Sequence, residues 1–209
     1  MKKYLVFLPL LLLPWCAPAS PAGFEEGKNC VSYTVRERFL MFVERTVSGV
    51  NCDVLVRFDE VGSSSYRFNM IIPVAGFHSD NGLRDRQVRK ILGEERNPNM
   101  FLTTEVRGLE EWKHILAQPA YQHTGYLSVA GNAVTMPHFT ADNVVAGTRF
   151  TTGFAEFKFS DFGLKPPDLL WGLIVKVGDD IRLDFRFYNN QVEGIEKLEG
   201  RPLLQSAKR

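Results

Sequence analysis

Side chains alternate between two faces along the stretch Ile181-Arg-Leu-Asp-Phe-Arg-Phe-Tyr188, and this pattern indicates the class of fold. Ile181, Leu183, Phe185 and Phe187 fall on one face, and two arginines, an aspartate and a tyrosine fall on the other. A period of two is typical of a β-strand with one buried and one solvated face. Residues 170–177 form a second apolar strand just upstream, and Gly178-Asp179-Asp180 between the two strands predicts a tight hairpin turn.

The same alternation recurs along most of the chain. It predicts further strands over residues 53–58, 66–74, 100–107, 126–130, 132–139 and 148–159. Gly131 lies between two of these segments and predicts another hairpin. In the last segment the phase slips between Phe154 and Phe157, which predicts a β-bulge. Strands with one apolar face must curl into a barrel or meet a second sheet, so the sequence predicts a barrel or a sandwich.

Two segments break this pattern. Residues 83–92 are rich in helix formers with a loose apolar stripe, and Asp80 or Asn81 is placed to cap their start. Residues 110–116 predict a second short helix. The segment from Gln191 to Arg209 is polar, and we expect a peripheral tail there.

The first 22 residues have the order of a secretory signal peptide. Lys2 and Lys3 precede an apolar run over residues 4–13, and small residues follow it. Cleavage after Ala19 or after Ala22 fits this pattern. Cys16 offers a rival interpretation, lipidation, but the bulky Trp15 just before it argues against a lipoprotein signal. We therefore expect an exported domain over residues 23–190.

Export bears on whether the remaining cysteines form a disulfide. An oxidising compartment favours a disulfide between Cys30 and Cys52, and two buried thiols are the alternative. Loss of Lys2 and Lys3 leaves 23 basic against 24 acidic residues, so the balance of charge does not favour nucleic acid as a partner. No later apolar run is long enough for a membrane span, and we expect a soluble mature protein.

Five segments together resemble one protein family. They are, in order, residues 77–92 with the pair Arg84-Asp85, residues 97–101 around Pro98, residues 125–131, residues 155–163 ending in Ser-Asp-Phe-Gly, and residues 177–183. Their order and content resemble the YceI-like family of lipocalin-like proteins over about residues 30 to 189. There are departures: Gln87 stands where a histidine is common, and Ile91-Leu92-Gly93 replaces an aromatic stretch.

The resemblance implies an all-β fold, an antiparallel eight-stranded lipocalin-like barrel with one or two short helices. It also implies a periplasmic protein that binds polyisoprenoids or other long-chain amphiphiles. Inward side chains would then line the ligand chamber or simply fill the core. The predicted lining residues are Phe68, Met70, Ile72, Phe154, Phe157, Trp171, Leu173, Val175, Leu183, Phe185 and Phe187.

Polar contacts to a headgroup are a separate question. Arg84, Asp85 and Arg86 could meet a headgroup at the barrel mouth, and a solvated helix face is the alternative. Apolar contact could supply affinity without such an anchor, because each methylene-sized unit removed from water contributes roughly 0.8 kcal/mol.

No catalytic motif is present in the sequence. It contains no G-x-S-x-G, H-E-x-x-H or C-x-x-C pattern. The four histidines are scattered; His123 and His138 could meet across a hairpin and bind a metal, but ordinary hydrogen-bonded histidines are the simpler interpretation. We therefore expect neither an enzyme nor a metal or cofactor site.

The sequence thus predicts a carrier or sequestering protein. Its ligand would be a polyisoprenoid, an isoprenoid quinone or a fatty amide, held inside the barrel in the periplasm. Transient membrane contact and a homodimer are compatible with this function. The alternative is an envelope interaction protein whose barrel is packed and whose outer surface binds a partner.

Overall fold

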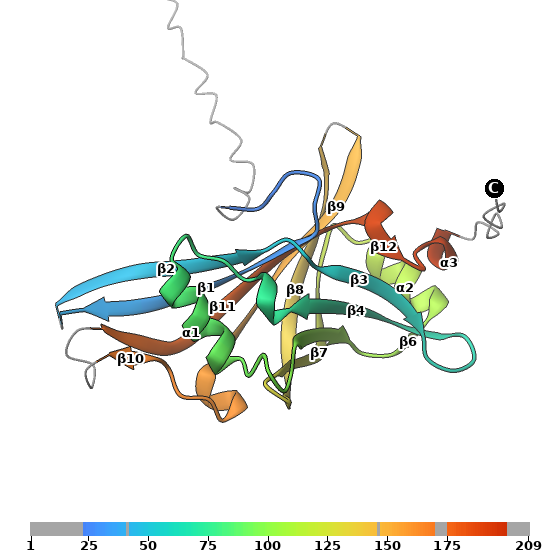
Figure 1. Ribbon diagram of the computed structural model, residues 1–209. Helices are drawn as coiled ribbons and strands as arrows, with labels where there is room; N and C mark the ends of the chain where they lie inside the picture. Colours follow the sequence, from blue (N-terminus) through green and yellow to red (C-terminus); the bar gives the residue numbers. More distant parts are fainter. Residues whose placement is uncertain (1–22, 41, 146, 170–174, 200–209) are drawn as a thin grey trace, which may run out of the picture.

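The computed structural model describes residues 23–199, apart from residues 41, 146 and 170–174. Within them the strands form one curled sheet, with helices at its ends (Figure 1). The strands are β1 (Cys30–Phe39), β2 (Val43–Asn51), β3 (Leu55–Glu60), β4 (Ser65–Pro73), β5 (Asn99–Thr104), β6 (Arg107–Gly108), β7 (Ala120–Val129), β8 (Asn132–Val145), β9 (Thr148–Lys158), β10 (Asp168–Leu169), β11 (Val175–Tyr188) and β12 (Val192–Glu193). The helices are η1 (Val74–Gly76), α1 (Gly82–Ile91), α2 (Leu109–Leu116), η2 (Phe159–Phe162), η3 (Asn189–Gln191) and α3 (Glu196–Glu199).

The sheet follows the order β12-β3-β4-β5-β7-β8-β9-β11-β1-β2. All pairs are antiparallel except β12 with β3. The predicted all-β, lipocalin-like fold with short helices is confirmed. The sheet has twelve strands rather than eight, and three of them (β6, β10 and β12) contain only two residues. None of the helices within the described residues has the length and hydropathy needed to cross a membrane.

The hairpin predicted at Gly178-Asp179-Asp180 is wrong. These residues lie within β11, which runs unbroken for 14 residues. On the neighbouring strand β1, Val35 pairs with Ile181 and Glu37 pairs with Val177. Gly178, Asp179 and Asp180 therefore face a shorter stretch of β1 and form an irregularity in the ladder. Asp179 is not a turn residue; its carboxylate accepts hydrogen bonds from the backbone N–H and the hydroxyl of Ser160 at the start of η2.

The hairpin predicted around Gly131 is correct. Val129 pairs with Asn132, and the two residues between them, Ala130 and Gly131, both have positive φ. This is the backbone conformation that a two-residue turn between twisted strands requires, and it suits glycine well. The resulting β7–β8 hairpin is long, with ten residues of β7 paired.

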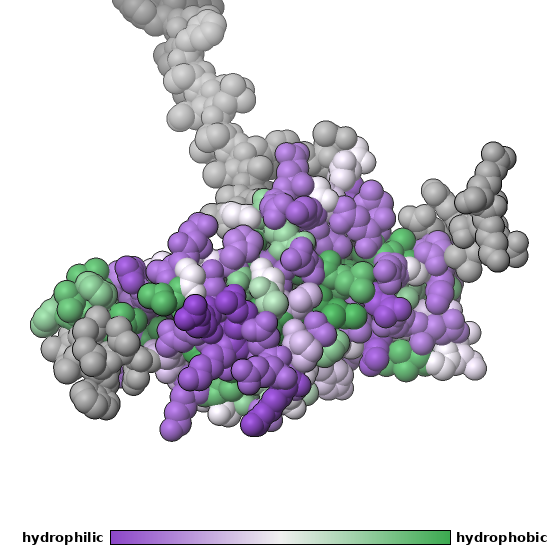
Figure 2. Space-filling model, viewed as in Figure 1, coloured by the Kyte–Doolittle hydropathy of each residue, from purple (hydrophilic) through white to green (hydrophobic). Residues whose placement is uncertain are grey.

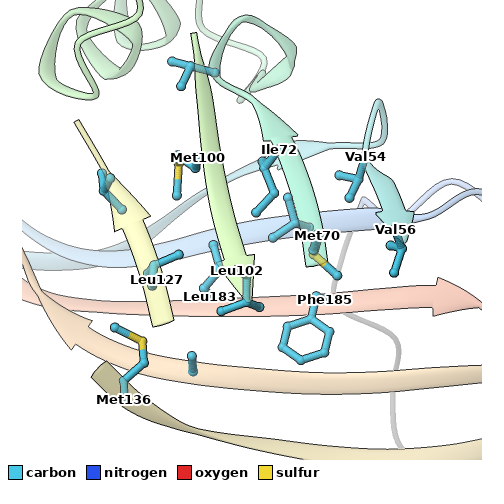
Figure 3. Close-up of a cluster of buried hydrophobic side chains, with 14 of the residues drawn as sticks. Val54, Val56, Met70, Ile72, Met100, Leu102, Leu127, Met136, Leu183 and Phe185 are labelled. Carbon is cyan, nitrogen blue, oxygen red and sulfur yellow. The ribbon is translucent and has the colours of Figure 1, made fainter. Parts of the chain in front are cut away.

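The core lies on the concave face of the sheet. Leu183 and Phe185 are 1% and 4% exposed, so the alternation predicted for residues 181–188 has the correct phase. They pack among side chains from β3, β4, β5, β7 and β8, as Figure 3 shows. The centre of the curled sheet is therefore filled by protein side chains.

The bulge predicted between Phe154 and Phe157 is absent from β9, which pairs with β11 without a register shift. Phe154 is on the outer face, where it stacks on Phe139 and lies under the guanidinium group of Arg182. Ala155, with no exposure, takes the inward position. The apparent phase slip arises because one phenylalanine is on the outside, covered by two neighbours.

Each of the two longer helices closes one region of the sheet. Asn81 caps α1, since its side chain accepts hydrogen bonds from the backbone N–H groups of Leu83 and Arg84. In α2 the side chain of Trp112 is fully buried, and its indole N–H donates to the carbonyl of Tyr66 at 2.8 Å. Both helices agree with the sequence-based prediction to within a residue or two.

The segment after Gln191 is not peripheral throughout. Val192 is buried and pairs with Val56 of β3, and Ile195 and Leu198 pack on the main core. The spacing of three residues between these apolar side chains places them on one side of the chain end. The expected polar tail therefore contributes to the core over residues 192–198.

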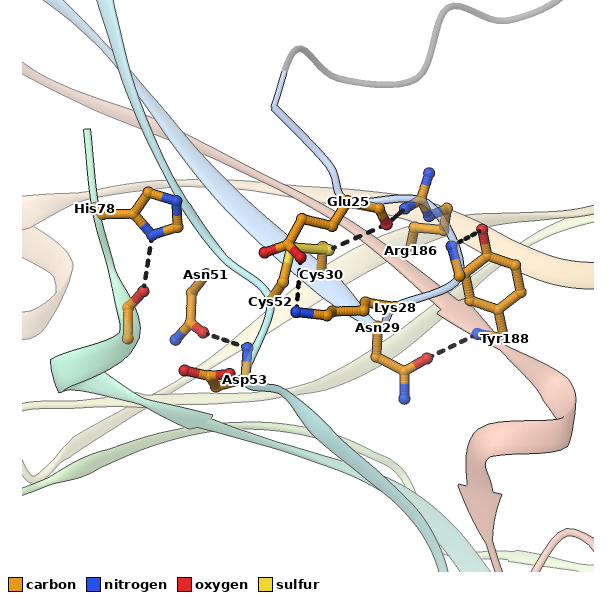
Figure 4. Close-up of a disulfide and its surroundings, with 12 residues drawn as sticks. Glu25, Lys28, Asn29, Cys30, Asn51, Cys52, Asp53, His78, Arg186 and Tyr188 are labelled. Atoms are coloured by element: carbon orange, nitrogen blue, oxygen red, sulfur yellow. Dashed lines mark hydrogen bonds and ion pairs between the residues drawn. A yellow bond between two sulfur atoms is a disulfide. The ribbon is translucent and has the colours of Figure 1, made fainter. Parts of the chain in front are cut away.

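A disulfide joins Cys30 and Cys52 and ties the start of β1 to the chain just after β2 (Figure 4). The adjacent Asn51 donates from its amide to the carbonyl of Pro73 at 2.7 Å and accepts from the backbone N–H of Asp53 at 2.8 Å. Further along β2, Val50 exchanges two backbone hydrogen bonds with His78. These contacts fasten the last residues of β2 to the end of β4 and to the segment between η1 and α1.

Candidate ligand-binding site

An apolar groove lies between α1 and the part of the sheet formed by β1, β2, β9 and β11. Its volume is about 350 Å³, toward the lower end of the range of roughly 300–1,000 Å³ found for small-molecule sites. The strand side is lined by Val35, Val47, Phe157, Val177, Ile181 and Leu183, and the helix side by Val88, Ile91 and Leu92. The groove can therefore enclose an apolar chain between a helix and a sheet.

The walls of the groove are fixed by a small satellite core. Val35, Val47, Phe159 and Val177 are buried together, away from the main core. Phe159 is held at the start of η2, whose first turn is hydrogen-bonded to Asp179. Asp179, which was predicted to lie in a hairpin turn, thus holds η2 in place and positions Phe159 in one wall of the groove.

Few polar side chains line the groove. Glu37 is buried and forms a salt bridge with Arg45, which remains half exposed. Asn81, Arg84 and Gln87 lie along the helix side. Glu37 is paired, so the groove has no unbalanced charge of its own at this position.

The predicted headgroup residues do not act as one cluster. Arg84 lines the groove, and its guanidinium group donates to the carbonyl and hydroxyl of Ser79, each at 3.4 Å. The carboxylate of Asp85 accepts from the Ser79 hydroxyl at 2.6 Å. Arg86 is exposed and is not among the groove residues. Only Arg84 of the three is placed beside a ligand in the groove.

A second, smaller pocket lies deeper in the curled sheet, on the side of α2. It has a volume of about 40 Å³ and is lined by Val56, Phe68, Met70, Leu102, Thr104, Trp112, Tyr121, His123, His138, Thr140, Phe185 and Phe187. Met100 and Leu183 line the groove, whereas Leu102 and Phe185, two residues further along the same strands, line the pocket. Neighbouring layers of inward side chains therefore line the two spaces, and Figure 3 shows these four residues side by side in the core.

The predicted lining residues divide between these two spaces. Phe157, Val175 and Leu183 line the groove, and Phe68, Met70, Phe185 and Phe187 line the inner pocket. Ile72 is fully buried in the core. Phe154 is a correction, because it is on the outer face for the reason given above. Trp171 and Leu173 lie outside the described residues.

Sequence reasoning missed the contribution of β1 and β2. Tyr33, Val35, Glu37, Arg45 and Val47 all line the groove, yet no strand was predicted between residues 30 and 51. The alternation of Val31, Tyr33 and Val35 is a usable signal. It is obscured further along β1, where the inward position is occupied by a glutamate that only its partner Arg45 on the neighbouring strand makes acceptable.

The inner pocket also brings together two histidines. His123 and His138 are directly opposite each other on β7 and β8, and their ring centroids are 5.5 Å apart. Burial, and for His123 also the positive charge of a protonated His138 and of Arg107, lowers the pKa of each ring to about 4. Among the described residues there is no group of three or more His, Cys, Asp or Glu side chains that could hold a metal ion.

A curled antiparallel sheet with a helix lying over an apolar groove defines a lipocalin-like protein with room for an apolar guest. The chain belongs to the YceI-like family, whose YceI-like domain matches residues 25–188. The recognition made from the five sequence segments is thereby confirmed. A comparison with curated proteins found no match.

Several solved structures are similar. BcnA of Burkholderia cenocepacia is 19% identical, with a TM-score of 0.54 and coverage of 75% of this chain and 94% of BcnA. The YCEI protein of Campylobacter jejuni is 18% identical, with a TM-score of 0.48 and coverage of 67% and 82%. A polyisoprenoid binding domain from Saccharophagus degradans, implicated in plant cell wall breakdown, is 11% identical, with a TM-score of 0.48 and coverage of 76% and 92%. The likeness to BcnA supports the fold.

Proposed function

We propose that this protein binds a long-chain apolar amphiphile, a polyisoprenoid, an isoprenoid quinone or a fatty amide, and carries or sequesters it in the periplasm. The observation that carries the proposal is the groove of about 350 Å³ under α1, with its mainly apolar lining. Membership of the YceI-like family supports binding rather than catalysis.

The groove suits a flexible chain for physical reasons. Each methylene-sized unit transferred from water contributes roughly 0.8 kcal/mol, and part of this is offset by the ordering of the ligand. The lining is provided by branched aliphatic side chains on one wall and by the rings of Phe157, Phe159 and Phe162 on another. Such surfaces give broad contact without demanding one ligand shape.

Two observations support export. The order of basic, apolar and small residues at the N-terminus is that of a signal peptide. The Cys30–Cys52 disulfide fits an oxidising compartment. N-terminal sequencing of protein recovered from the periplasmic fraction tests this, with a mature chain beginning at Ser20 or at Gly23 as the expected result. Recovery of the uncleaved chain in the cytoplasm would contradict it.

Contact with a membrane would let such a carrier exchange its ligand. The end of the β1–β2 hairpin exposes Leu40, Phe42 and Val43, and Phe42 is 86% exposed (Figure 2). The hairpin forms a wall of the groove through Val35 and Val47. Three side chains are too few for the roughly 800 Å² per partner of a stable dimer, but they are enough to insert into a bilayer surface.

The packed centre of the sheet favours one alternative to a ligand-binding function. Leu127, Leu183 and Phe185 leave no wide channel along the sheet axis. A protein with this interior could instead act through its outer surface as an envelope interaction module. The two functions differ in whether a lipid accompanies the protein.

Lipid extraction of the purified protein, followed by mass spectrometry, separates them. We expect a long-chain lipid at close to one molecule per chain for the wild type, and at least about tenfold less for Ile181→Glu, which places a charge in the groove. Val144→Glu is the matched control, because Val144 is exposed on β8 and is not among the groove residues. Absence of lipid from the wild type would favour the interaction module, and equal lipid in Ile181→Glu would mean that the lipid binds outside the groove.

A further inference from the structure

The pairing of β7 with β8 places two buried histidines side by side. His123 is 9% and His138 is 1% exposed, and their rings are stacked with an interplanar angle of 25°. Gly125, the next inward position on β7, leaves room for them, since a Cβ there would lie 3.0 Å from Cε1 of His138. Both rings line the inner pocket under α2.

None of the four ring nitrogens makes a hydrogen bond of good geometry in the described residues, and the backbone of Met136 offsets only part of the lowering of the His138 pKa. Three polar groups around them are engaged elsewhere. The indole N–H of Trp112 donates to Tyr66, the hydroxyl of Thr140 donates to the carbonyl of Tyr121, and the hydroxyl of Thr104 bonds with the backbone of Phe68. An unsatisfied buried polar group costs roughly 1–3 kcal/mol, so this pocket is built to receive a polar partner.

The chemistry of that partner follows from the charge of the rings. Both imidazoles are neutral at pH 7, so each offers one donor and one acceptor. The rest of the pocket is largely apolar and aromatic, and the nearby Arg107 is paired with Glu105 and Glu111. A carboxylate or phosphate would be desolvated there without a free cation, whereas an uncharged group that both donates and accepts would satisfy the rings.

We infer that the His123–His138 pair binds the uncharged polar end of the ligand, a hydroxyl or a primary amide, with the apolar chain extending toward the groove. This inference rests on the carrier function proposed above. The volume of about 40 Å³ fits a terminal polar group and not a ring system.

The path between pocket and groove is short. Neighbouring layers of inward side chains line the two spaces, and Met70, Met100 and Met136 belong to the buried cluster around them (Figure 3). Methionine side chains are unbranched and flexible, so they can move aside for a chain at little cost. The rival polar end, Arg84 at the groove, already donates to Ser79 and needs no further partner.

Matched isoprenoids test the inference on the delipidated mature protein. Farnesol, farnesene and farnesoic acid share one chain and differ in having an alcohol, no polar group and an acid. For the wild type we expect farnesol to bind about tenfold more tightly than farnesene or farnesoic acid. In the double variant His123→Leu/His138→Leu the alcohol and the hydrocarbon should bind within about threefold of each other, while Arg86→Gln, at an exposed position of α1 outside the groove, should keep the wild-type preference.

Nitrogen-15 NMR of the histidine rings in the wild type supplies a readout that does not depend on a variant folding. Farnesol should shift the ring signals of both histidines, and farnesene should leave the donor and acceptor pattern unchanged. No shift with bound farnesol would mean that water satisfies the rings, and would overturn the inference. So would stoichiometric binding of Zn²⁺ or Cu⁺ by the pair, or loss of the alcohol preference in Arg84→Gln alone.

Failure of the inference is distinguishable from failure of the carrier function. If all three ligands bind the wild type equally, the groove binds lipid and the histidines do not select its end. If none of them binds and no lipid is recovered on extraction, the proposed function and the inference both fail.

Discussion

The ring of Phe185 lies directly against Gly153, its cross-strand neighbour on β9. A Cβ added at Gly153 would be 2.3 Å from Cζ of Phe185 and 2.5 Å from the carbonyl oxygen of Phe139. The glycine is therefore what allows Phe185 to lie flat in the core between the sheet and the inner pocket.

Gly153→Ala should lower the free energy of unfolding by about 1–3 kcal/mol, because the new methyl group overlaps a buried ring and a backbone atom that cannot both move. Urea denaturation measures this. Gly178→Ala is the matched control: Gly178 is on β11, and a Cβ there would lie 3.4 Å from the nearest atom, the carbonyl oxygen of Arg36. Equal stability of the two variants would contradict the packing described for Phe185.

Reduction of the disulfide should destabilise the protein without abolishing the sheet. Cys30 and Cys52 are 22 residues apart, and a loop of that length is worth about 3 kcal/mol in the chain-entropy account. We expect Cys30→Ala/Cys52→Ala to lose roughly this amount in urea denaturation. Wild-type protein treated with a reductant should match the double variant, and an unchanged midpoint in both would count against a contribution from the bridge.

The exposed hairpin end should govern binding to membranes. Phe42→Ser together with Leu40→Asn should weaken cosedimentation with phosphatidylethanolamine–phosphatidylglycerol vesicles at least about tenfold, because two large apolar side chains are lost from the surface. Asparagine suits position 40, where φ is 48°.

Val144→Ser is the control, since Val144 is 68% exposed on β8 and belongs to a different hairpin. It should bind vesicles as the wild type does. Failure of the wild type to sediment with vesicles, or an equal loss in the control, would rule out a membrane role for the β1–β2 end.

The histidine pair should make stability depend on pH. The folded-state pKa of each ring is lowered to about 4 from 6.5, so the unfolded chain binds more protons between these values. The free energy of unfolding should therefore fall as the pH falls from 6.5 to about 4, by about 1.4 kcal/mol per pH unit for each histidine. Above pH 6.5 this contribution should be constant.

Urea denaturation of the wild type and of His123→Leu/His138→Leu at pH 7.5, 6, 5 and 4 measures the effect. Protonation of carboxylates is common to both proteins, so the difference between their slopes isolates the pair. Parallel curves would mean that the two rings are accessible to protons in the folded protein.

Local alternation predicted much of the sheet. It correctly predicted which side chains of residues 181–188 point inward, that Met70 and Ile72 point inward, and that β7 and β8 form a hairpin. These results could be predicted because alternation with a period of two shows which face of a strand is buried. The same signal identified part of the apolar lining of both spaces, but not the part that β1 and β2 supply to the groove. The capping of α1 by Asn81 was likewise readable, since it depends on residues adjacent in sequence.

What could not be predicted depends on neighbours distant in sequence. Gly178-Asp179-Asp180 has the composition of a turn, but pairing with β1 and the hydrogen bonds from Ser160 keep these residues in one long strand. Phe154 is outside because Phe139 and Arg182 cover it. The sequence suggested that His123 and His138 could meet across a hairpin, but only register and burial show that the rings are paired in a buried pocket.

A crystal structure of the mature protein purified without delipidation would show whether the groove holds a lipid. We expect elongated, continuous density in the groove between α1 and β11, in contact with Phe157 and Val177. A groove that holds only water, with α1 collapsed onto the sheet, would contradict the proposed carrier function.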